Sequence, residues 1–272
     1  MQQIELALKL KLRCVEVRAD LLRTAGLSDD ELLSVVVAAK AAGLACLYTL
    51  RHADQGGTFA ASESDRVALC THALNAGADI IDLEHGTEAA SIMLQLSAPM
   101  ILSYHNFKSM LSAEELAVLS VAMENQVPAA IKIVPTGNSI NDAATMLSWV
   151  GAANRHVRRI GFTMGDDGGT SRVLTLAHGA PITYASFDKP VAPGQIDIAL
   201  LLERYQCMDM NSDTKIVALL GDQTQIDHYM DKQLNNSKQQ SGAVVWVGFA
   251  STDRAMVEQH QQAMKISEIH LL

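Results

Sequence analysis

Short apolar runs alternate with longer amphipathic runs along most of the chain. The short runs are rich in Val, Ile, Leu, Thr, Tyr or Phe and are bounded by Gly, Pro, Asn or Asp, a pattern typical of strands. We therefore predict strands at residues 13–20, 44–51, 79–85, 99–107, 129–135, 157–165 and 181–187.

The segments between these strands carry helix signatures. Three of them begin with the S-x-x-[DE] capping pattern, in which two side chains satisfy the first free N–H groups of a helix. These are Ser28 with Glu31, Ser62 with Asp65, and Ser112 with Glu115. We also predict helices at residues 2–12 and 194–205.

Strands that each precede a helix predict parallel βα units. Such units build either a doubly wound open sheet or a (β/α)8 TIM barrel. Polar residues gather at the C-terminal ends of many of the strands instead of at one switch point, which favours the barrel. Because the chain opens on a helix, we expect an α/β fold that is a TIM barrel lacking its first strand.

The regular alternation of predicted strands and helices is interrupted after about residue 208. Residues 207–215 are typical of a linker, and 215–222 and 243–250 predict two strands around a polar helix. Residues 252–272 predict a further helix that runs into a short apolar end. We therefore predict two domains, 1–208 and a small α/β extension at 209–272, which is short for an independent core.

The composition excludes several classes of protein. A net charge of −9 argues against nucleic-acid binding, and 49% hydrophobic residues exclude a disordered chain. The longest apolar runs are too short to span a membrane, and the N-terminus lacks a secretory pattern. The four cysteines form no CxxC pair, and no metal or nucleotide motif occurs. We expect a cytoplasmic protein with reduced thiols.

Five successive predicted strands place ionisable or hydroxyl groups on one face and aliphatic groups on the other. Charged residues are rarely buried without a function, so we expect these groups to point into a barrel mouth, where the active sites of this fold lie. They are Glu16, Arg18 and Asp20; Thr49 and Arg51; Asp82 and Glu84; Ser103 and His105; and Lys132.

Lys132 lies between two isoleucines on its strand. Desolvation and nearby cations such as Arg18 and Arg51 would lower the pKa of its amine, and a neutral amine can form an imine with a carbonyl. The structural alternative is a lysine that reaches solvent at a strand end or pairs with Glu84 or Glu16.

The other groups are open to two interpretations each. His105 is either a general acid or base, or a hydrogen-bonded core histidine. Glu16, Arg18 and Asp20 fit a structural ion network as well as a binding site. Asp82 with Glu84 fits either a catalytic pair or, as we favour, a support network beneath the lysine. The glycine loop at residues 167–172 suits an anionic group or a simple tight turn.

Taken in order, these motifs resemble type I 3-dehydroquinate dehydratase over about residues 1–205. They are ExR at Glu16 and Arg18, TxR before Gly56 and Gly57, DLE at 82–84, SxHxF at 103–107, KI at Lys132, the glycine stretch 164–172 ending in Arg172, and APGQ at 192–195.

The resemblance implies a shikimate-pathway lyase of aromatic amino acid biosynthesis, without metal or external cofactor. Lys132 would form an imine with 3-dehydroquinate, and His105 would move protons on the way to 3-dehydroshikimate. Arg172 would pair with the substrate carboxylate, and Gln195 would hold the substrate together with Glu16, Arg18 and Arg51. Expected partners are this small molecule and, as an open alternative, a second copy in a homodimer, but no nucleic acid or membrane.

The chain departs from the family pattern at three places. Gln55 stands where the family has a glutamate bonded to the catalytic histidine, and an amide cannot stabilise an imidazolium by charge. Val191 stands where the family has a small or hydroxylated residue. The first barrel strand is missing, and we expect residues 215–222 or a partner chain to cover the open edge.

The extension resembles the first two strands of shikimate dehydrogenase, at residues 214–222 and 243–250. Gln223 replaces the proline expected after the first strand, the shikimate-binding serine pair is not recognisable, and no nucleotide-binding half follows. We interpret it as a truncated remnant without dehydrogenase activity. Two alternatives to an active dehydratase stay open: a catalytically impaired relative that acts as a binding or interaction protein, and a class I aldolase-like barrel.

Overall fold

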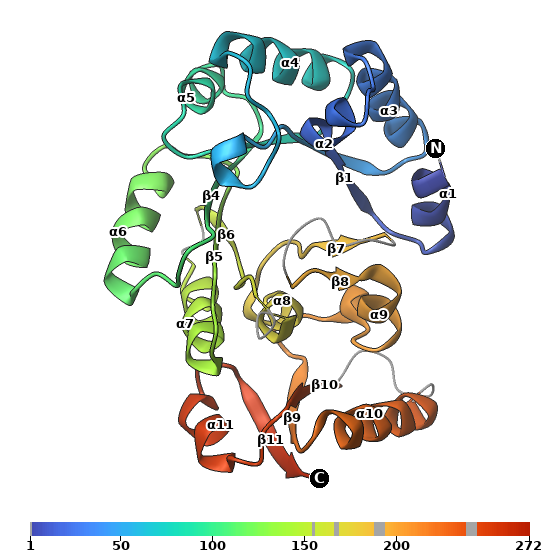
Figure 1. Ribbon diagram of the computed structural model, residues 1–272, viewed down its shortest axis with the longest axis vertical. Coiled ribbons are helices and arrows are strands. Elements are labelled where there is room, and N and C mark those ends of the chain that lie inside the picture. The colour runs from blue at the N-terminus through green and yellow to red at the C-terminus, as the bar shows by residue number, and fades with distance from the viewer. Residues whose placement is uncertain (1, 154–155, 166–168, 188–193, 238–243) are drawn as a thin grey trace. The chain divides into compact units, whose positions relative to one another are not determined.

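The computed structural model describes residues 2–153, 156–165, 169–187, 194–237 and 244–272 (Figure 1). The chain divides into two compact units. The first unit contains residues 1–107 and 117–132, and the second contains residues 108–116 and 133–272. Each is described separately.

The first unit repeats a strand followed by one or more helices. After α1 (Gln2–Lys9), its elements are β1 (Cys14–Arg18), α2 (Ala19–Thr24), α3 (Asp29–Ala41), β2 (Ala45–Thr49), the 3-10 helix η1 (Ala53–Gln55), α4 (Glu63–Asn75), β3 (Ile80–Glu84), α5 (Glu88–Gln95) and β4 (Met100–Asn106). The division between the units falls within α6 (Ala113–Glu124) and β5 (Ala130–Pro135).

The strands form a six-stranded sheet in the order β1-β2-β3-β4-β5-β6, where β6 is Arg158–Gly161. The pairs β1/β2, β2/β3 and β3/β4 are parallel. A doubly wound sheet reverses its strand order at a switch point, whereas a TIM barrel keeps chain order. The sequential order therefore confirms the α/β prediction and its barrel-type topology.

Local signals in the sequence explain where the helices begin. Ser28 and Glu31 form a complete capping box at the start of α3. The Ser62 side chain accepts a hydrogen bond from the backbone N–H of Asp65, and Ser112 accepts one from Glu115. All three predicted caps are confirmed, and each fixes the residue at which its helix begins.

The second unit holds the shorter elements and the extension. They are α7 (Ile140–Gly151), β6, α8 (Gly169–Leu174), η3 (Leu176–His178), β7 (Ala185–Ser186), β8 (Ile196–Asp197), α9 (Ile198–Glu203), η4 (Cys207–Asp209), β9 (Lys215–Leu220), α10 (Gln223–Ser237), β10 (Val244–Phe249), α11 (Arg254–His260) and β11 (Ile266–Leu271). The seventh predicted strand is reduced to two residues, which pair with β8.

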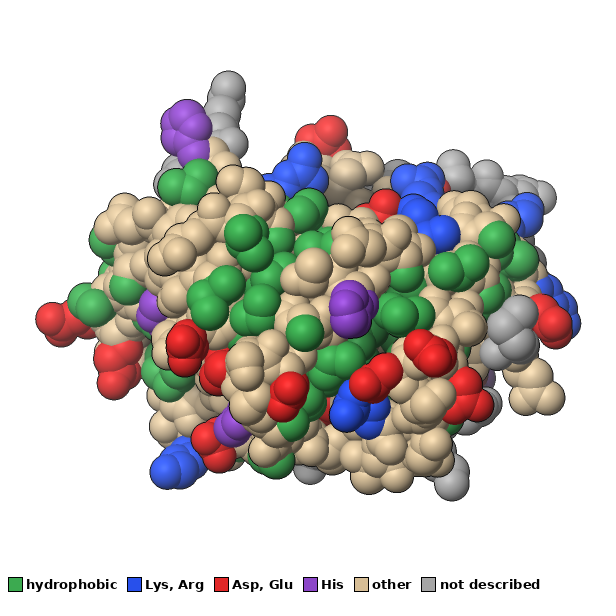
Figure 2. All heavy atoms as spheres, turned by 90° about the horizontal axis from the view of Figure 1, so that it is seen from above, with side chains coloured by type: hydrophobic (Ala, Val, Ile, Leu, Met, Phe, Trp, Pro, Cys, Tyr) green, Lys and Arg blue, Asp and Glu red, His purple; other side chains and the backbone are tan. Residues whose placement is uncertain are grey.

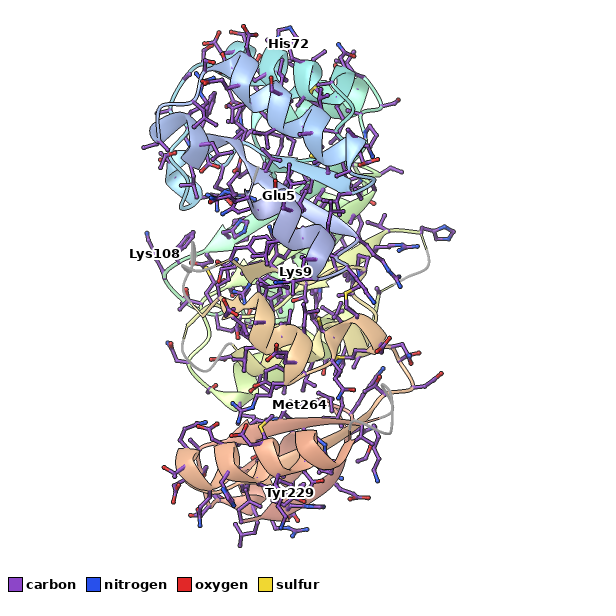
Figure 3. All side chains as sticks on the ribbon, turned by 90° about the vertical axis from the view of Figure 1, so that its right-hand side faces the viewer. Glu5, Lys9, His72, Lys108, Tyr229 and Met264 are labelled. Atoms are coloured by element: carbon purple, nitrogen blue, oxygen red, sulfur yellow. The ribbon has the colours of Figure 1, made fainter. Side chains whose placement is uncertain are left out.

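The extension forms a parallel three-stranded sheet in the order β10-β9-β11. Because side chains alternate along a strand, Ile216, Ala218 and Leu220 of β9 enter one hydrophobic cluster, while Val217 and Leu219 enter another. Met264 lies in the first cluster, and Tyr229 packs against the second (Figure 3).

Two predictions for the extension are wrong. Its last apolar residues form strand β11 instead of the end of a helix. Residues 215–220 pair with β10 and β11 as the central strand of the separate three-stranded sheet, so their expected pairing with the open edge is wrong, whereas coverage of that edge by a partner chain stays a prediction. The first cluster also contains Leu147 of α7 and Leu174 of α8, so the extension shares a core with these helices. The domain boundary near residue 209 stays a prediction.

The face of the molecule seen from above carries hydrophobic side chains together with acidic and basic ones (Figure 2). Cys14 is exposed, whereas Cys46, Cys70 and Cys207 are buried, and all four are free thiols. Within the described residues, the helices are too short or too polar to cross a bilayer.

Candidate active site

The side chain of Lys132 lies in the interior of the first unit, where β5 positions it. Only 5% of the residue is exposed, and every residue of β5 is buried. Its Nζ donates a hydrogen bond to Oδ2 of Asp82 on β3, at 3.1 Å. Neither Glu84 nor Glu16, the partners considered from the sequence, forms this contact. Asp82 thus fixes the position of the Lys132 amine within a buried site.

The second carboxylate oxygen of Asp82 also accepts hydrogen bonds. Oδ1 accepts hydrogen bonds from Nη2 of Arg51 at 2.7 Å and from Oγ of Ser103 at 2.6 Å. Asp82 and Ser103 have no exposed surface, and Arg51 is 4% exposed. Because both carboxylate oxygens are hydrogen-bonded, the Asp82 side chain is held in one orientation. The direction of its hydrogen bond to Lys132 is therefore set.

Arg51 links Asp82 to Glu84. Its Nη1 donates to Oε1 of Glu84 at 2.9 Å and to Oγ of Ser103 at 2.6 Å. The backbone N–H of His52 also donates to the same Glu84 oxygen, at 3.0 Å. The TxR, DLE and SxH motifs are therefore parts of one hydrogen-bonded network, as a support beneath the lysine requires.

Arg66 completes this network, and the sequence reasoning missed it. It comes from α4, is fully buried, and donates from Nη2 to Oε2 of Glu84. From the sequence, an arginine near the start of a serine-capped helix is expected to be exposed to solvent. Its partners could not be inferred from the local pattern, because they lie 16 and 18 residues away along the chain. The only available signal was the unusual number of acidic groups on the neighbouring strands.

The residues of β1 form two smaller contacts. Oε1 of Glu16 accepts a hydrogen bond from Oγ1 of Thr49 at 2.7 Å. Arg18 forms a bidentate pair with Asp20, at 2.9 and 2.8 Å, and Asp20 also accepts from the backbone N–H of Thr58. Asp20, considered above as part of an ion network, thus anchors Arg18 and the loop after η1.

Gln55 contacts the backbone of His105. Its Oε1 accepts a hydrogen bond from the His105 backbone N–H at 2.9 Å. Asp54 next to it is largely exposed. Nδ1 of His105 is buried and forms no hydrogen bond among the described residues. Gln55 therefore positions the end of β4 through its backbone and does not bind the imidazole at this nitrogen.

The two glycines after Gln55 allow the loop to pack closely. Gly56 has a positive φ of 77°, and a Cβ there would lie 2.2 Å from Cζ of Phe107. A Cβ on Gly57 would lie 2.0 Å from the backbone oxygen of Arg51. The rings of Phe107 and His105 stack with centroids 6.4 Å apart. Gly56 of the Gly-Gly pair thus packs directly against Phe107 of the SxHxF motif, in a position that leaves no room for a side chain.

Burial dominates the protonation of the two reactive groups. It lowers the pKa of the Lys132 ammonium; Asp82 opposes this shift, Arg51 adds to it, and the net direction is downward. Burial, with the charges of Arg51 and Lys132, also holds the pKa of His105 well below 6.5. Burial alone would raise the pKa of Asp82, but Arg51 and Lys132 lower it, so the carboxylate stays ionised. The downward direction for Lys132 agrees with the prediction from the sequence.

Two further predicted residues belong to the second unit. Arg172 of α8 is 2% exposed, its Nε donates to the backbone oxygen of Gly194 at 3.1 Å, and its Cζ lies 4.0 Å from the ring centroid of Phe162. Burial lowers the pKa of Arg172 to about 10. Gln195 is half-buried before β8. Val191 and the glycine-loop residues 166–168 lie outside the described residues.

The described residues contain no group of three or more His, Cys, Asp or Glu side chains arranged to hold a metal ion. The buried polar cluster is instead a set of carboxylates matched by guanidinium and ammonium groups. Such a cluster can hold an amine nucleophile in place and can supply a neutral imidazole for proton transfer.

The amino-acid sequence is similar to several characterised proteins. It is 32% identical to a 3-dehydroquinate dehydratase of Dehalococcoides mccartyi over 173 residues, which are 62% of this chain and 78% of that protein. It is 31% identical to a bifunctional 3-dehydroquinate dehydratase/shikimate dehydrogenase of Arabidopsis thaliana over 216 residues, 76% of this chain and 34% of that protein.

The fold is shared with solved structures at lower identity. The 3-dehydroquinate dehydratase of Geobacillus kaustophilus superposes with a TM-score of 0.66 and 22% identity over 74% of this chain and 82% of its own. The dehydroquinate dehydratase and shikimate dehydrogenase of S. pombe gives 0.61 and 20% over 96% of this chain and 52% of its own. The family model described as type I 3-dehydroquinase matches residues 1–212. The chain therefore belongs to the type I 3-dehydroquinase family.

Proposed function

We propose that this protein is a Schiff-base lyase that dehydrates 3-dehydroquinate to 3-dehydroshikimate in the shikimate pathway. Family membership and the names of the relatives support this reaction. The observation that carries it is the buried amine of Lys132, whose pKa is lowered and whose direction is fixed by Asp82. A lysine of this kind is suited to attack a ketone as a neutral amine.

In the proposed reaction, Nζ of Lys132 attacks the C3 carbonyl of the substrate. Loss of water leaves an iminium, which accepts the electron pair of the C2–H bond when a base removes that proton. The resulting enamine expels the C1 hydroxyl as water, and hydrolysis of the product imine regenerates the amine. Asp82 would keep the lysine aimed at the ketone and balance the positive charge that develops on nitrogen.

His105 is the proposed base and acid. Its lowered pKa keeps the imidazole neutral at physiological pH, so a nitrogen is available to accept the C2 proton. The same lowering makes the imidazolium a stronger acid, which suits the later protonation of the departing hydroxyl. The buried Nδ1 without a hydrogen bond in the described residues provides the nitrogen for this transfer.

The remaining predicted residues are proposed to hold the substrate. Arg172 would pair with its carboxylate, because a planar guanidinium offers two parallel donors to this group. Glu16, Arg18, Arg51 and Gln195 would contact its hydroxyls and orient the ring. In the first unit, the bonds of Arg51 to Asp82, Ser103 and Glu84 also make it a support of the lysine.

The decisive experiment is borohydride reduction in the presence of 3-dehydroquinate, followed by peptide mass spectrometry. We expect a substrate-derived mass increase on the peptide that contains Lys132, together with enone absorbance from turnover without reductant. The variant Lys132→Arg is the matched control, since it keeps the positive charge but cannot form an imine. Absence of trapping and of enone formation in the natural chain would contradict the proposal.

A catalytically impaired relative that acts as a binding protein is the second candidate. The contact of Gln55 favours it, because no carboxylate among the described residues of the first unit bonds the His105 ring. An impaired relative would bind 3-dehydroquinate, measured by calorimetry, without trapping or turnover.

For the extension, we infer a remnant related to the first strands of shikimate dehydrogenase. The parallel β10-β9-β11 order and the similarity to the two-function S. pombe protein over 96% of the chain support this origin. The proposal predicts no NADP-dependent oxidation of shikimate by the purified chain. Detectable oxidation would contradict it.

A further inference from the structure

Arg66 is a fully buried cation that belongs to the hydrogen-bonded network beneath Lys132. Its exposed fraction is 0%. Nε and Nη2 donate to the backbone oxygen of Leu50 at 3.2 and 2.7 Å, and Cζ lies 5.7 Å from the ring centroid of Phe59. These contacts fix the guanidinium, and Nη2 also donates to Glu84. Complete burial of an arginine lowers the free energy of unfolding unless an opposite charge compensates for its desolvation.

The charges of the fully buried part of this network are balanced before Lys132 is counted. Its two fully buried carboxylates, Asp82 and Glu84, are matched by two guanidiniums, Arg51 and Arg66. Nη1 of Arg66 also lies 3.5 Å from Oε1 of Glu63, whose side chain is 27% exposed and is screened by solvent. Both guanidiniums are always protonated, whereas the lysine amine can lose its proton. With Arg66 present, the neutral form of Lys132 leaves the fully buried part of the network uncharged. Without it, the same form would leave a net negative charge in a buried site.

We propose that Arg66 is a positioning residue that neutralises Glu84 and so allows Lys132 to lie uncharged beside Asp82. The inference rests on the proposed function, because only imine formation requires a neutral amine at this position. Arg66 acts through Glu84 and Arg51 and needs no contact with substrate. Its role is to set the charge of the site, in addition to attaching α4 to the end of β2.

The groups around Lys132 come from four neighbouring segments. Asp82 of β3 and Glu16 of β1 favour its charged form, while Arg51 after β2 and burial favour its neutral form, and the pKa is lowered overall. His105 of β4 interacts electrostatically with it as well. Arg66 offsets the one remaining buried carboxylate of the network, Glu84, which would otherwise add to the influence of Asp82 and Glu16.

The test measures the titration of Lys132 directly and without substrate. Competitive labelling with acetic anhydride across a pH series, read by mass spectrometry, reports the fraction of each lysine that is neutral. We expect Arg66→Gln to move the midpoint for Lys132 upward by about one pH unit, the order of magnitude for loss of one nearby unit charge at an effective dielectric constant of ~20. The acid limb of kcat/KM should move with it.

Three further variants separate charge from structure. Glu84→Gln should move the Lys132 midpoint downward, Arg66→Gln with Glu84→Gln should return it close to the natural value, and Arg66→Lys should stay closer to the natural value than Arg66→Gln. Arg23→Gln is the matched control, because this arginine of the first unit forms an exposed ion pair that solvent screens. A purely structural role would move all the Arg66 and Glu84 variants in the same direction.

If Arg66→Gln does not fold, the Glu84→Gln, double and Arg66→Lys variants decide. Equal Lys132 midpoints in the natural chain, Glu84→Gln and every folded Arg66 variant would overturn the inference. Failure of the proposed function gives a different result, namely no borohydride trapping in the natural chain whatever its lysine titration shows. The two proposals can therefore fail separately.

Discussion

The network beneath Lys132 and the hydrophobic cluster around β9 are both buried, but they are built on opposite principles. The first matches charge against charge between β3, β4, α4 and the segment after β2, with nearly every polar atom fixed by a partner. The second packs aliphatic side chains of the extension against α7 and α8. Buried ion networks contribute little net stability, whereas apolar burial contributes most of it. The comparison assigns chemistry to the first region and stability to the second.

The largest expected effect is on activity, from Lys132→Met. Removal of the amine takes away the nucleophile, and we expect the rate of enone formation to fall by at least about 10³-fold. Methionine fills a similar volume, and Asp82 keeps Arg51 and Ser103 as partners. Thermal unfolding should therefore occur at a temperature no lower than in the natural chain. A large loss of stability would show that the network also maintains the fold.

The largest expected effect on stability comes from the other region. Leu220 is fully buried in the cluster around β9, and Leu220→Ala should cost about 2–5 kcal/mol of unfolding free energy. The turnover per folded molecule should not change. Leu271→Ala is the matched control, because this leucine of the neighbouring strand β11 is 60% exposed and should cost less than about 0.5 kcal/mol. Chemical denaturation measures both variants.

A smaller effect on rate is expected from Gln55→Glu. The glutamate can accept the same hydrogen bond from the His105 backbone, and its charge would stabilise the imidazolium that forms during proton transfer. We expect turnover to rise several-fold, up to about tenfold. The variant Gln55→Met, which removes the acceptor, should lower it. An unchanged rate in Gln55→Glu would mean that the amide at this position does not limit proton transfer.

The sequence predicted the parts of this comparison that depend on local pattern. Strands β1 to β5 are short runs in which polar and aliphatic residues alternate, and this alternation brought Arg51, Asp82 and Ser103 together as they are in the structure. Arg66 was missed because a buried arginine on a helix looks the same in sequence as a solvated one. Strand β11 was missed because Ile266, Ile269 and Leu271 do not alternate regularly. Both depend on contacts between residues far apart in the chain, which a local pattern does not contain.

The smallest expected effect concerns His178, a buried histidine that contacts both α8 and the extension. Nδ1 of His178 lies 2.9 Å from the backbone oxygen of Leu174, and Nε2 lies 3.2 Å from that of Ala263. Both partners are acceptors, so a neutral imidazole can satisfy only one of them. Burial nevertheless lowers the pKa of His178 below 6.5, and the charge of Lys265 acts in the same direction.

A lowered pKa means that the unfolded chain binds this proton more readily than the folded chain does. The contribution of neutral His178 to stability is therefore fully present above the unfolded pKa of ~6.5 and is lost as the pH falls through the interval down to the folded pKa. We expect the urea midpoint to fall between about pH 7.5 and pH 5, and to fall less in His178→Gln, whose amide keeps donors near both carbonyls but does not titrate. His105 and His85, whose pKa values are also lowered by burial, contribute to the slope that remains. An equal slope in both proteins would show that the contact does not couple the extension to pH, and the second region would then depend on apolar packing alone.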